Sequence, residues 1–265
     1  MNFLAIGIAT AVVALTGLVL GFLLSYMGEK FKVEVDERET AIREILPSAN
    51  CGGCGYAGCD ALAAAIAKGE APVTACPVGG AALAEKISAI MGVEKQESKR
   101  MVAFVRCAGT CTKTRDNYVY YGPKDCRLAF LSPGHGSKKC YWGCCGFGTC
   151  AEVCPFDAIR IVDDLAVVDK EKCKGCMKCL EACPGGLITM VPYESKYAVM
   201  CSSKSKGKDV KLSCDEGCIG CKMCVPVCET GAISVIHNLA RIDQEKCNGC
   251  GKCAEKCPTK IIRVK

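Results

Sequence analysis

The longest uncharged stretch of this 265-residue chain lies at its start, where residues 3–27 are apolar or small. Such a run is long enough to cross the roughly 30 Å hydrocarbon core of a bilayer as one helix. It exceeds the roughly 7–15 apolar residues of a signal peptide, and no Lys or Arg precedes it. The pattern predicts a retained transmembrane anchor over residues 1–28, with residues 3–27 in the lipid bilayer.

The charges that flank this anchor predict its orientation. Lys30 and Lys32 follow the anchor, whereas no charged side chain precedes it. Because positive residues tend to stay on the cytoplasmic side, we expect a single-pass protein of the cell membrane whose C-terminal bulk lies in the cytoplasm. The anchor contains no ionisable residue of the kind that carries ions through membranes. An ion path would therefore belong to other subunits.

Helical patterns dominate the next part of the chain. Residues 29–47 alternate in charge and end at Pro47, which predicts a solvent-exposed helical stalk. Two Ala-rich stretches, 60–68 and 81–91, predict short helices. We expect them to belong to a small helical domain over residues 48–95.

Alternating, strand-like stretches come later and occur twice. Residues 154–179 align without a gap on residues 228–253, which lie 74 positions further along. In each copy two alternating stretches flank a pair of turn residues, Asp163-Asp164 in the first and His237-Asn238 in the second. This arrangement is a hairpin signal, and it predicts two similar domains.

Composition adds chemistry to this pattern through 26 Cys residues. Most of them stand two or three residues apart, too close to cross-link distant segments, which disfavours a disulfide scaffold. Zinc sites use two separated pairs of ligands, often with His, and the chain has only 2 His residues. Three runs, beginning at Cys173, Cys218 and Cys247, have the spacing C-x2-C-x2-C-x3-C, which bacterial ferredoxins use to bind 4Fe–4S clusters.

The repeats and the runs together predict the fold class α+β, with an N-terminal transmembrane helix, a small helical 4Fe–4S domain and two tandem two-cluster ferredoxin-like domains. The ferredoxin-like domains are expected over residues 139–192 and 213–265, with a short helix after the third Cys of each run. One connecting segment, 193–212, joins them. Another, 96–138, precedes them and contains a strand-like stretch at residues 102–105.

Two-cluster ferredoxins cross their ligands, so that the fourth Cys of one run binds the other cluster. In the second domain this rule predicts two ligand sets: Cys218, Cys221, Cys224 and Cys257, and Cys228, Cys247, Cys250 and Cys253. In the first domain it predicts one complete set: Cys173, Cys176, Cys179 and Cys154. The companion set is incomplete, because Phe147 stands where the second repeat has Cys221.

The missing ligand must come from nearby, and Cys140 and Cys145 are the two candidates. Cys140 is preferred, because adjacent Cys residues seldom bind one cluster together. The companion set is then predicted to be Cys140, Cys144, Cys150 and Cys183, with Cys145 left over.

A separate set of cysteines lies in the predicted helical domain. Cys51, Cys54 and Cys59 have C-x2-C-x4-C spacing among glycines, which allow the backbone to wrap closely around a ligand, and Cys76 follows. Five 4Fe–4S clusters are therefore expected. A sixth is an alternative on the remaining cysteines, Cys107, Cys111 and Cys126 with Cys201 or Cys214, which otherwise are buried structural thiols.

The formal net charge of +6 leaves two interpretations open. The basic residues form two groups: Lys95, Lys99, Arg100 and Arg106, and Lys196, Lys204, Lys206, Lys208 and Lys211. They are either a solvated surface that offsets the charge of thiolate-ligated clusters or a docking patch for an acidic partner such as reduced ferredoxin. Nucleic-acid binding is disfavoured, because no recognition module is present.

The order of these motifs resembles one family over essentially the whole chain. An N-terminal anchor, the segment NCGGCGYAGC from Asn50 with Cys76, and tandem ferredoxin-type runs are together similar to the B subunit of the Rnf complex. The segments FVRCAGTC from Phe104 and CSSKSKGKDV from Cys201 are similar to its longer members. The resemblance implies a subunit of an ion-translocating oxidoreductase that passes electrons from reduced ferredoxin into a membrane complex, which reduces NAD and exports sodium or protons.

On its own the chain is then an electron carrier with no catalytic residues, and no dinucleotide-binding G-x-G-x-x-G unit is found. Two other functions are weighed against this one. The first is an iron–sulfur subunit of another membrane dehydrogenase or hydrogenase, which the set from Cys51 to Cys76 disfavours. The second is a zinc-stabilised interaction protein, which would contain no acid-labile sulfide.

Overall fold

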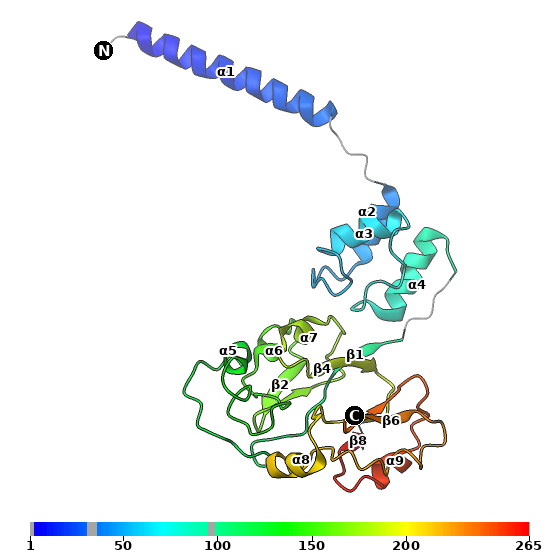
Figure 1. The fold of residues 1–265 in the computed structure, drawn as a ribbon. Coiled ribbons are helices and arrows are strands. Elements are labelled where there is room, and N and C mark those ends of the chain that lie inside the picture. Colours follow the sequence, from blue (N-terminus) through cyan, green and yellow to red (C-terminus); the bar gives the residue numbers. More distant parts are fainter. Residues whose placement is uncertain (1–2, 31–35, 95–98, 265) are drawn as a thin grey trace.

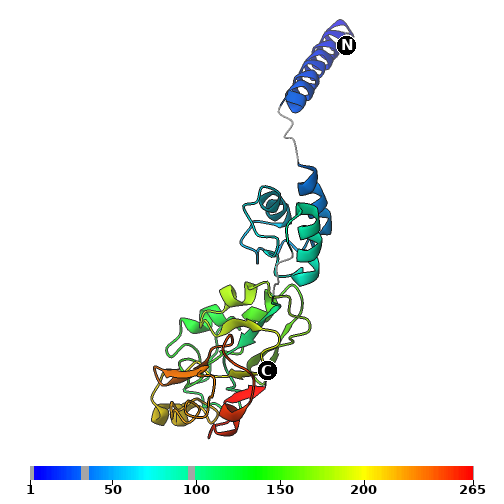
Figure 2. The same ribbon diagram turned by 90° about the vertical axis from the view of Figure 1, so that its right-hand side faces the viewer.

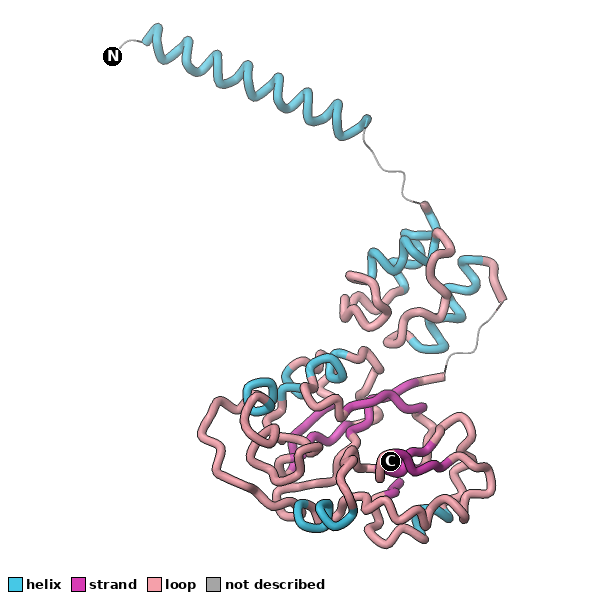
Figure 3. The backbone as a smooth tube through the Cα atoms, viewed as in Figure 1, coloured by secondary structure: helices cyan, strands magenta, loops and turns pink. Residues whose placement is uncertain are grey.

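The computed structural model describes residues 3–30, 36–94 and 99–264. One long helix precedes three packed parts, and the first of these parts is purely helical in Figures 1 and 3. The other two each contain strands, and we call them the first unit (residues 99–192) and the second unit (residues 193–264). Parts of the predicted stalk and of the first basic group, including Lys32 and Lys95, lie outside the described residues.

The N-terminal helix α1 (Phe3–Lys30) matches the predicted anchor. Its segment Thr10–Lys30 has a mean hydropathy of 2.0 and no buried residue, so by length and composition it could cross a membrane. It is the one helix of this kind within the described ranges. Figures 1 and 2 show it separated from the packed parts.

The helical part consists of α2 (Glu37–Ile45), α3 (Cys59–Ala67) and α4 (Gly80–Met91). The two Ala-rich helices were predicted correctly. The solvent-exposed stalk was not, because Ile42 of α2 is fully buried and Leu46 is 3 % exposed. Both side chains pack into one apolar core with α3 and α4. The helix α2 is therefore part of the domain that the sequence placed after it.

The first unit is built on two strand pairs. Antiparallel strands β1 and β4 form one pair, and the hairpin β2–β3 forms the other. Three short helices precede or follow the hairpin. The elements are β1 (Met101–Val105), α5 (Cys126–Phe130), α6 (Thr149–Glu152), β2 (Ile159–Val162), β3 (Leu165–Val168), α7 (Lys178–Ala182) and β4 (Ile188–Pro192).

The second unit repeats this plan. Strands β5 and β8 pair antiparallel, as do β6 and β7. The elements are β5 (Tyr197–Val199), α8 (Gly207–Ser213), β6 (Ile233–Ile236), β7 (Leu239–Ile242), α9 (Lys252–Glu255) and β8 (Ile262–Val264). Strands β1 and β5 both come from segments that the sequence predicted as connections, so the paired strands of each unit extend beyond the predicted domain starts.

Both hairpins turn where the sequence predicted. Asp163 and Asp164 have φ values of 50° and 56°, and His237 and Asn238 have 50° and 62°. Two consecutive residues with positive φ form the type I′ turn that suits the twist of a two-residue hairpin. Asp and Asn tolerate this conformation better than most residues, which explains their place in three of the four positions.

The strand registers extend the repeat beyond the aligned sequence. Val105 pairs with Ile188 in the first unit, and Val199 pairs with Ile262 in the second. Ile262 is the repeat equivalent of Ile188, 74 positions later, so Val199 is the equivalent of Val105. The next residues then correspond as well: Arg106 to Met200 and Cys107 to Cys201.

The expected helix after the third Cys of each run is absent from one run. Helices α7 and α9 follow the expectation, but the segment after Cys224 forms turns. Pro226 lies in this segment, and its ring lacks the N–H that an α-helix requires from its interior residues. The backbone instead forms turns, in which Val225 N donates to Lys222 O at 3.0 Å and Cys228 N to Val225 O at 3.2 Å.

One segment of the first unit makes several of the contacts between the two units. Thr114 forms an antiparallel bridge with Cys214, and Asp215 N donates to Lys113 O at 2.9 Å. An ion pair joins Arg115 to Asp215 at 3.0 Å. Each unit contributes most of one apolar core, but Ala198 of the second unit belongs to the core of the first, and Ala108 of the first unit belongs to the core of the second.

The burial of α2 predicts that Ile42→Ala loosens the helical part. Removing a fully buried Ile side chain costs about 2–5 kcal/mol. We expect the amides of α3 to exchange their hydrogens faster in the full chain, as measured by hydrogen–deuterium exchange with mass spectrometry. Glu44→Ala on the exposed side of α2 is the control. Equal exchange in the two variants would mean that α2 is only a spacer.

Candidate metal centres

Four cysteines of the helical part converge as the sequence predicted. Cys59 and Cys76 are buried in its core, and Cys54 packs against them. Burial raises the pKa of Cys76, and the charges of Cys54 and Cys51 raise it further. Asn50 orders this loop, because its Oδ1 accepts a hydrogen bond from Cys59 N at 2.8 Å.

The first unit contains one complete run, which begins at Cys173, and the cysteines of its predicted crossed set also lie close together. One pocket is lined by four cysteines of the predicted crossed set: Cys154, Cys173, Cys176 and Cys179. Burial raises the pKa of Cys179 to about 12, and the charges of the three other cysteines act in the same direction. Backbone amides point at these sulfurs, as shown by Ala103 N donating to Cys173 Sγ at 3.4 Å.

In the second unit the two predicted crossed sets are also brought together. Burial raises the pKa of Cys224 to about 11, and its charged neighbours are Cys218, Cys221 and Cys257. Burial likewise raises the pKa of Cys253, beside Cys247 and Cys228. Cys250 belongs to this last run and is exposed.

The first unit also has a run that begins at Cys144 and lacks a Cys at Phe147, and we call it the altered run. Its arrangement differs from the prediction. Its pocket is lined by five cysteines: Cys126, Cys144, Cys145, Cys150 and Cys183. Cys140 is not among them. Cys126 lies beside Phe147, whose backbone N–H lowers the pKa of Cys126 by hydrogen bonding to it, after larger effects from Cys145 and Thr149. Cys126 is the first residue of α5, and its own N–H donates to Thr149 Oγ1 at 2.8 Å.

Cys144 and Cys145 compete for the remaining place in this pocket. Cys144 is the repeat equivalent of Cys218, and the backbone that follows is the same in both units. Gly146 and Gly220 both have positive φ, 83° and 67°, and both pack against the turn of the neighbouring hairpin. Cys145 donates to His135 O at 3.3 Å, and its side chain also hydrogen-bonds with Cys126.

A group that the sequence predicted only in part, through Cys107 with Cys201 or Cys214, lies between the two units. Cys107, Cys140, Cys201 and Cys214 line one pocket together with Trp142 and Val210. Two of these cysteines come from each unit, and they are repeat equivalents: Cys107 of Cys201, and Cys140 of Cys214. Even the hydrogen bonds match, since Gly109 N donates to Cys107 Sγ and Ser203 N to Cys201 Sγ, each at 3.4 Å. We call these four residues the bridging group.

Two cysteines of the predicted sixth set lie elsewhere. Cys126 belongs to the altered run, and Cys111 is exposed, with its N–H bonded to Asp163 O at 2.9 Å. Sequence spacing could not separate them from Cys107, because the bridging group has no local spacing. The available signal was the equivalence of Val105–Cys107 and Val199–Cys201, which lie 94 rather than 74 positions apart.

The donor sets fit metal–sulfur clusters. No three Cys, His, Asp or Glu side chains in the described ranges are close enough to hold one metal ion. Three of the groups are defined by the wider pocket that their thiols line, and the other three by the proximity of their thiols. Burial raises the pKa of Cys140 to about 12 and that of Cys201 to about 11. Such thiols stay protonated near neutral pH unless a metal's positive charge stabilises the thiolates.

Neighbouring groups lie close enough for their charges to influence one another, in a fixed order. The charge of Cys51 raises the pKa of Cys176, after the larger effect of burial, so the helical part meets the complete run of the first unit. Within that unit the charge of Cys179 raises the pKa of Cys150 of the altered run, again after the larger effect of burial.

The same order continues through the bridging group into the second unit. Burial raises the pKa of Cys144 to about 11, and the charge of Cys107 raises it further. On the other side, Cys201 Sγ accepts a hydrogen bond from Cys218 N at 3.4 Å. The bridging group therefore touches one cysteine group of each unit.

The folds and the cysteine groups define an iron–sulfur protein of the electron-transfer class. A family model for an Fe-S cluster matches residues 46–78, and a 4Fe-4S dicluster domain matches residues 172–232 and 217–261.

Curated relatives identify the family more closely. The B subunit of a sodium-translocating ferredoxin:NAD oxidoreductase complex from Acetobacterium woodii is 48 % identical over 97 % of this chain and 78 % of that protein. The B subunit of an ion-translocating oxidoreductase complex from Methanosarcina acetivorans is 43 % identical over 96 % of this chain and 97 % of the relative. A proton-translocating counterpart from Clostridium ljungdahlii is 41 % identical over 96 % and 90 %. The chain belongs to this family of B subunits, as its motifs indicated.

The close contact between the helical part and the first unit gives a test. A Cβ added to Gly53 would lie 2.7 Å from Cys176 O, a backbone atom that cannot turn away. We expect Gly53→Ala to separate the two surfaces and to speed hydrogen exchange around Cys176 in the full chain. Gly185→Ala, whose Cβ would meet only side chains at 3.4 Å or more, is the control. Unchanged exchange in Gly53→Ala would show that the two parts do not pack as described.

Proposed function

We propose that this chain is the membrane-anchored electron wire of an ion-translocating ferredoxin:NAD oxidoreductase. It accepts electrons from reduced ferredoxin and passes them through bound 4Fe–4S clusters to membrane partners, which reduce NAD and export sodium or protons. The observation that supports this most directly is the unbroken order of cysteine groups from the second unit, through the bridging group and the first unit, to the helical part.

Six clusters are proposed, one for each cysteine group. The ligands would be Cys51, Cys54, Cys59 and Cys76; Cys154, Cys173, Cys176 and Cys179; Cys126, Cys144, Cys150 and Cys183; Cys107, Cys140, Cys201 and Cys214; Cys218, Cys221, Cys224 and Cys257; and Cys228, Cys247, Cys250 and Cys253. Each cluster supplies one-electron chemistry when bound. Cys145 and Cys111 remain outside these sets.

The protein's part in this chemistry is to bind the clusters, to shield them from water and to adjust their reduction potentials. Backbone N–H groups donate to sulfurs, as Leu187 N does to Cys183 Sγ at 3.5 Å and Ala158 N to Cys154 Sγ at 3.4 Å. Such bonds favour the more negative, reduced state. Apolar neighbours such as Phe156 keep water away from the sulfurs. No acid–base pair is needed, because only electrons move.

The anchor would hold the wire at the membrane with its three packed parts in the cytoplasm. Lys30 at the end of α1 supports this orientation through the positive-inside rule. A reducing cytoplasm also suits a chain with this many thiolate ligands. Because the helical part directly follows the anchor, its cluster would be the last before the membrane partners.

The basic segment 204–211 is the proposed docking patch for ferredoxin. Lys204, Lys206, Lys208 and Lys211 are exposed. Lys204 Nζ lies 4.9 Å from the centre of the Trp142 ring, and Trp142 and Val210 of α8 both line the bridging pocket. An acidic partner attracted to these charges would therefore sit over the bridging group.

Single cysteine replacements test the ligand sets. We expect Cys126→Ala and Cys201→Ala each to lose about four iron atoms and four sulfides per chain, which is one cluster. Cys111→Ala should lose none, because Cys111 is exposed and belongs to none of the proposed ligand sets. Iron and acid-labile sulfide are measured on the anaerobically purified full chain. Full iron content in Cys201→Ala would contradict the bridging cluster, and iron loss in Cys111→Ala would contradict the assignment of Cys126.

Charge reversal tests the docking patch. Lys204→Glu combined with Lys208→Glu should slow reduction of the full chain by ferredoxin about tenfold at low salt, with the difference shrinking as salt screens the charges. Stopped-flow bleaching of the clusters measures the rate. Lys68→Glu combined with Lys86→Glu, at two exposed positions of the helical part, is the control for total charge. The same rate and salt dependence in all three proteins would leave the segment as solvated surface.

A further inference from the structure

The bridging group is built from equivalent residues of the two units, but its charged surroundings are not equivalent. Arg106 precedes Cys107, whereas Met200 precedes Cys201. The backbones at these positions match, because Arg106 N donates to Leu187 O at 2.8 Å and Met200 N to Ile261 O at 3.0 Å. The same comparison applies two residues before Cys140 and Cys214, where the first unit has Lys138 and the second has Leu212.

Lys138 is a buried cation that is held by backbone carbonyls rather than by a carboxylate. Its side chain is 7 % exposed, and it is the one buried charged residue in the described ranges. Nζ donates to Gly109 O at 3.0 Å and to Asp164 O at 2.7 Å, and both acceptors lie next to the cysteine pockets. The charge of Lys138 also favours the thiolate of Cys144 against the larger effect of burial. The equivalent Leu212 is 52 % exposed and carries no charge.

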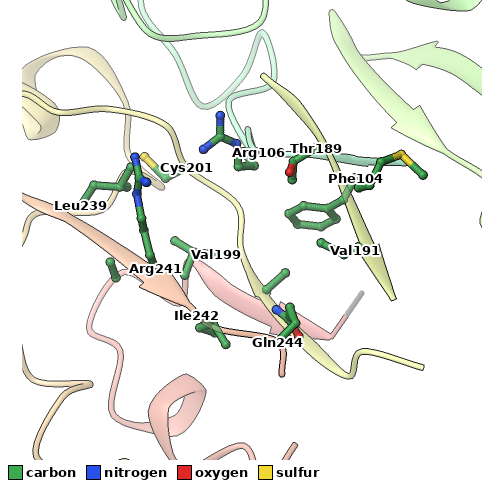
Figure 4. A pocket seen from close by; sticks show the side chains of 13 residues that line it. Phe104, Arg106, Thr189, Val191, Val199, Cys201, Leu239, Arg241, Ile242 and Gln244 are labelled. Carbon is green, nitrogen blue, oxygen red and sulfur yellow. The ribbon is translucent and has the colours of Figure 1, made fainter. Parts of the chain in front are cut away.

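Arg106 is a second cation on the first unit's side of the bridging group. Its Nη2 donates to Gly186 O at 2.8 Å, and its Nε is buried without a hydrogen-bond partner among the described residues. It lines a cavity of about 210 Å³ between the units, together with Cys201 and Arg241. Figure 4 shows the three side chains at one end of this cavity and Gln244 at the other. Arg241 belongs to the second unit, but it is exposed, so water screens its charge.

We propose that Lys138 and Arg106 raise the reduction potentials of the bridging cluster and the altered-run cluster, and so direct electrons from the second unit toward the first. This inference rests on the proposed six-cluster function. An added electron makes a cluster more negative, and a fixed cation in a low-dielectric interior stabilises that state. Met200 and Leu212 supply no such charge on the opposite side. One electron moves per step, and no bond forms or breaks.

The test is a redox titration of the full chain followed by EPR, with each variant given the residue of the equivalent position. Lys138→Leu and Arg106→Met should lower the midpoint potential of the signals that Cys126→Ala and Cys201→Ala remove. We expect about a tenfold fall in the reduced-to-oxidised ratio at a fixed potential, or about 59 mV for one electron. The other four signals should stay in place.

Conservative and neighbouring replacements separate charge from packing. Lys138→Arg and Arg106→Lys keep the cation, so their potentials should stay close to that of the parent chain. Lys139→Leu removes an adjacent but exposed cation and should shift nothing. If Lys138→Leu and Arg106→Met retain full iron and unshifted potentials, the inference is overturned. A shift that Lys138→Arg and Arg106→Lys do not rescue would also overturn it, because packing and not charge would be the cause.

Iron and sulfide counts keep this inference apart from the function on which it rests. A parent chain with about 24 iron atoms and no shift in the variants would contradict only the role of the two cations. A parent chain without the bridging cluster would contradict the proposed wire itself. If Lys138→Leu loses iron, Arg106→Met decides the question alone, because the Arg106 side chain makes a single hydrogen bond, to Gly186 O, within the described ranges.

Discussion

The structure depends on one constraint: buried thiols must be held together although each raises the pKa of its neighbours. All three apolar cores contain cysteines of the proposed ligand sets, such as Cys59 in the helical part, Cys173 in the first unit and Cys224 in the second. The strand pairs are only three to five residues long. Cores of this size gain much of their stability from bound metal, so cluster loading and folding are coupled.

A second consequence follows from the duplication of the units. In each unit a cysteine lies two residues after the end of a strand, Cys107 after β1 and Cys201 after β5, and neither unit alone offers four thiols at that place. Two equivalent pairs facing each other complete one group. The contact between the units is therefore also a proposed cluster site, and the connection that joins two packed cores is the one through which electrons would pass.

Local spacing explains what the sequence could predict. The runs from Cys173, Cys218 and Cys247, both hairpin turns and the Ala-rich helices are local features, and the structure agrees with the elements they predicted except for the helix expected after Cys224. Cys140 and Cys126 could not be placed in this way, because their neighbours come from distant segments. Cys107 and Cys140 are 33 positions apart, whereas Cys201 and Cys214 are 13 apart. The first unit therefore has 20 additional residues between its two cysteines, and they hide the equivalence of the two pairs. The burial of α2 was missed for a similar reason, since its charged residues concealed a short apolar face.

These additional residues account for most of the difference between the units. They supply Cys126, the proposed replacement for the thiol lost at Phe147, and the segment that contains them begins at Arg106 and ends beside Lys138. The residues that are equivalent in the two units keep the same arrangement of cysteine groups. The segment from Arg106 to Lys138 changes the proposed ligands and the charge in the first unit only. A symmetric wire would have no preferred direction between its halves. Concentrating the asymmetry next to the bridging group places it where it influences the step between the units most strongly, because electrostatic effects weaken with distance.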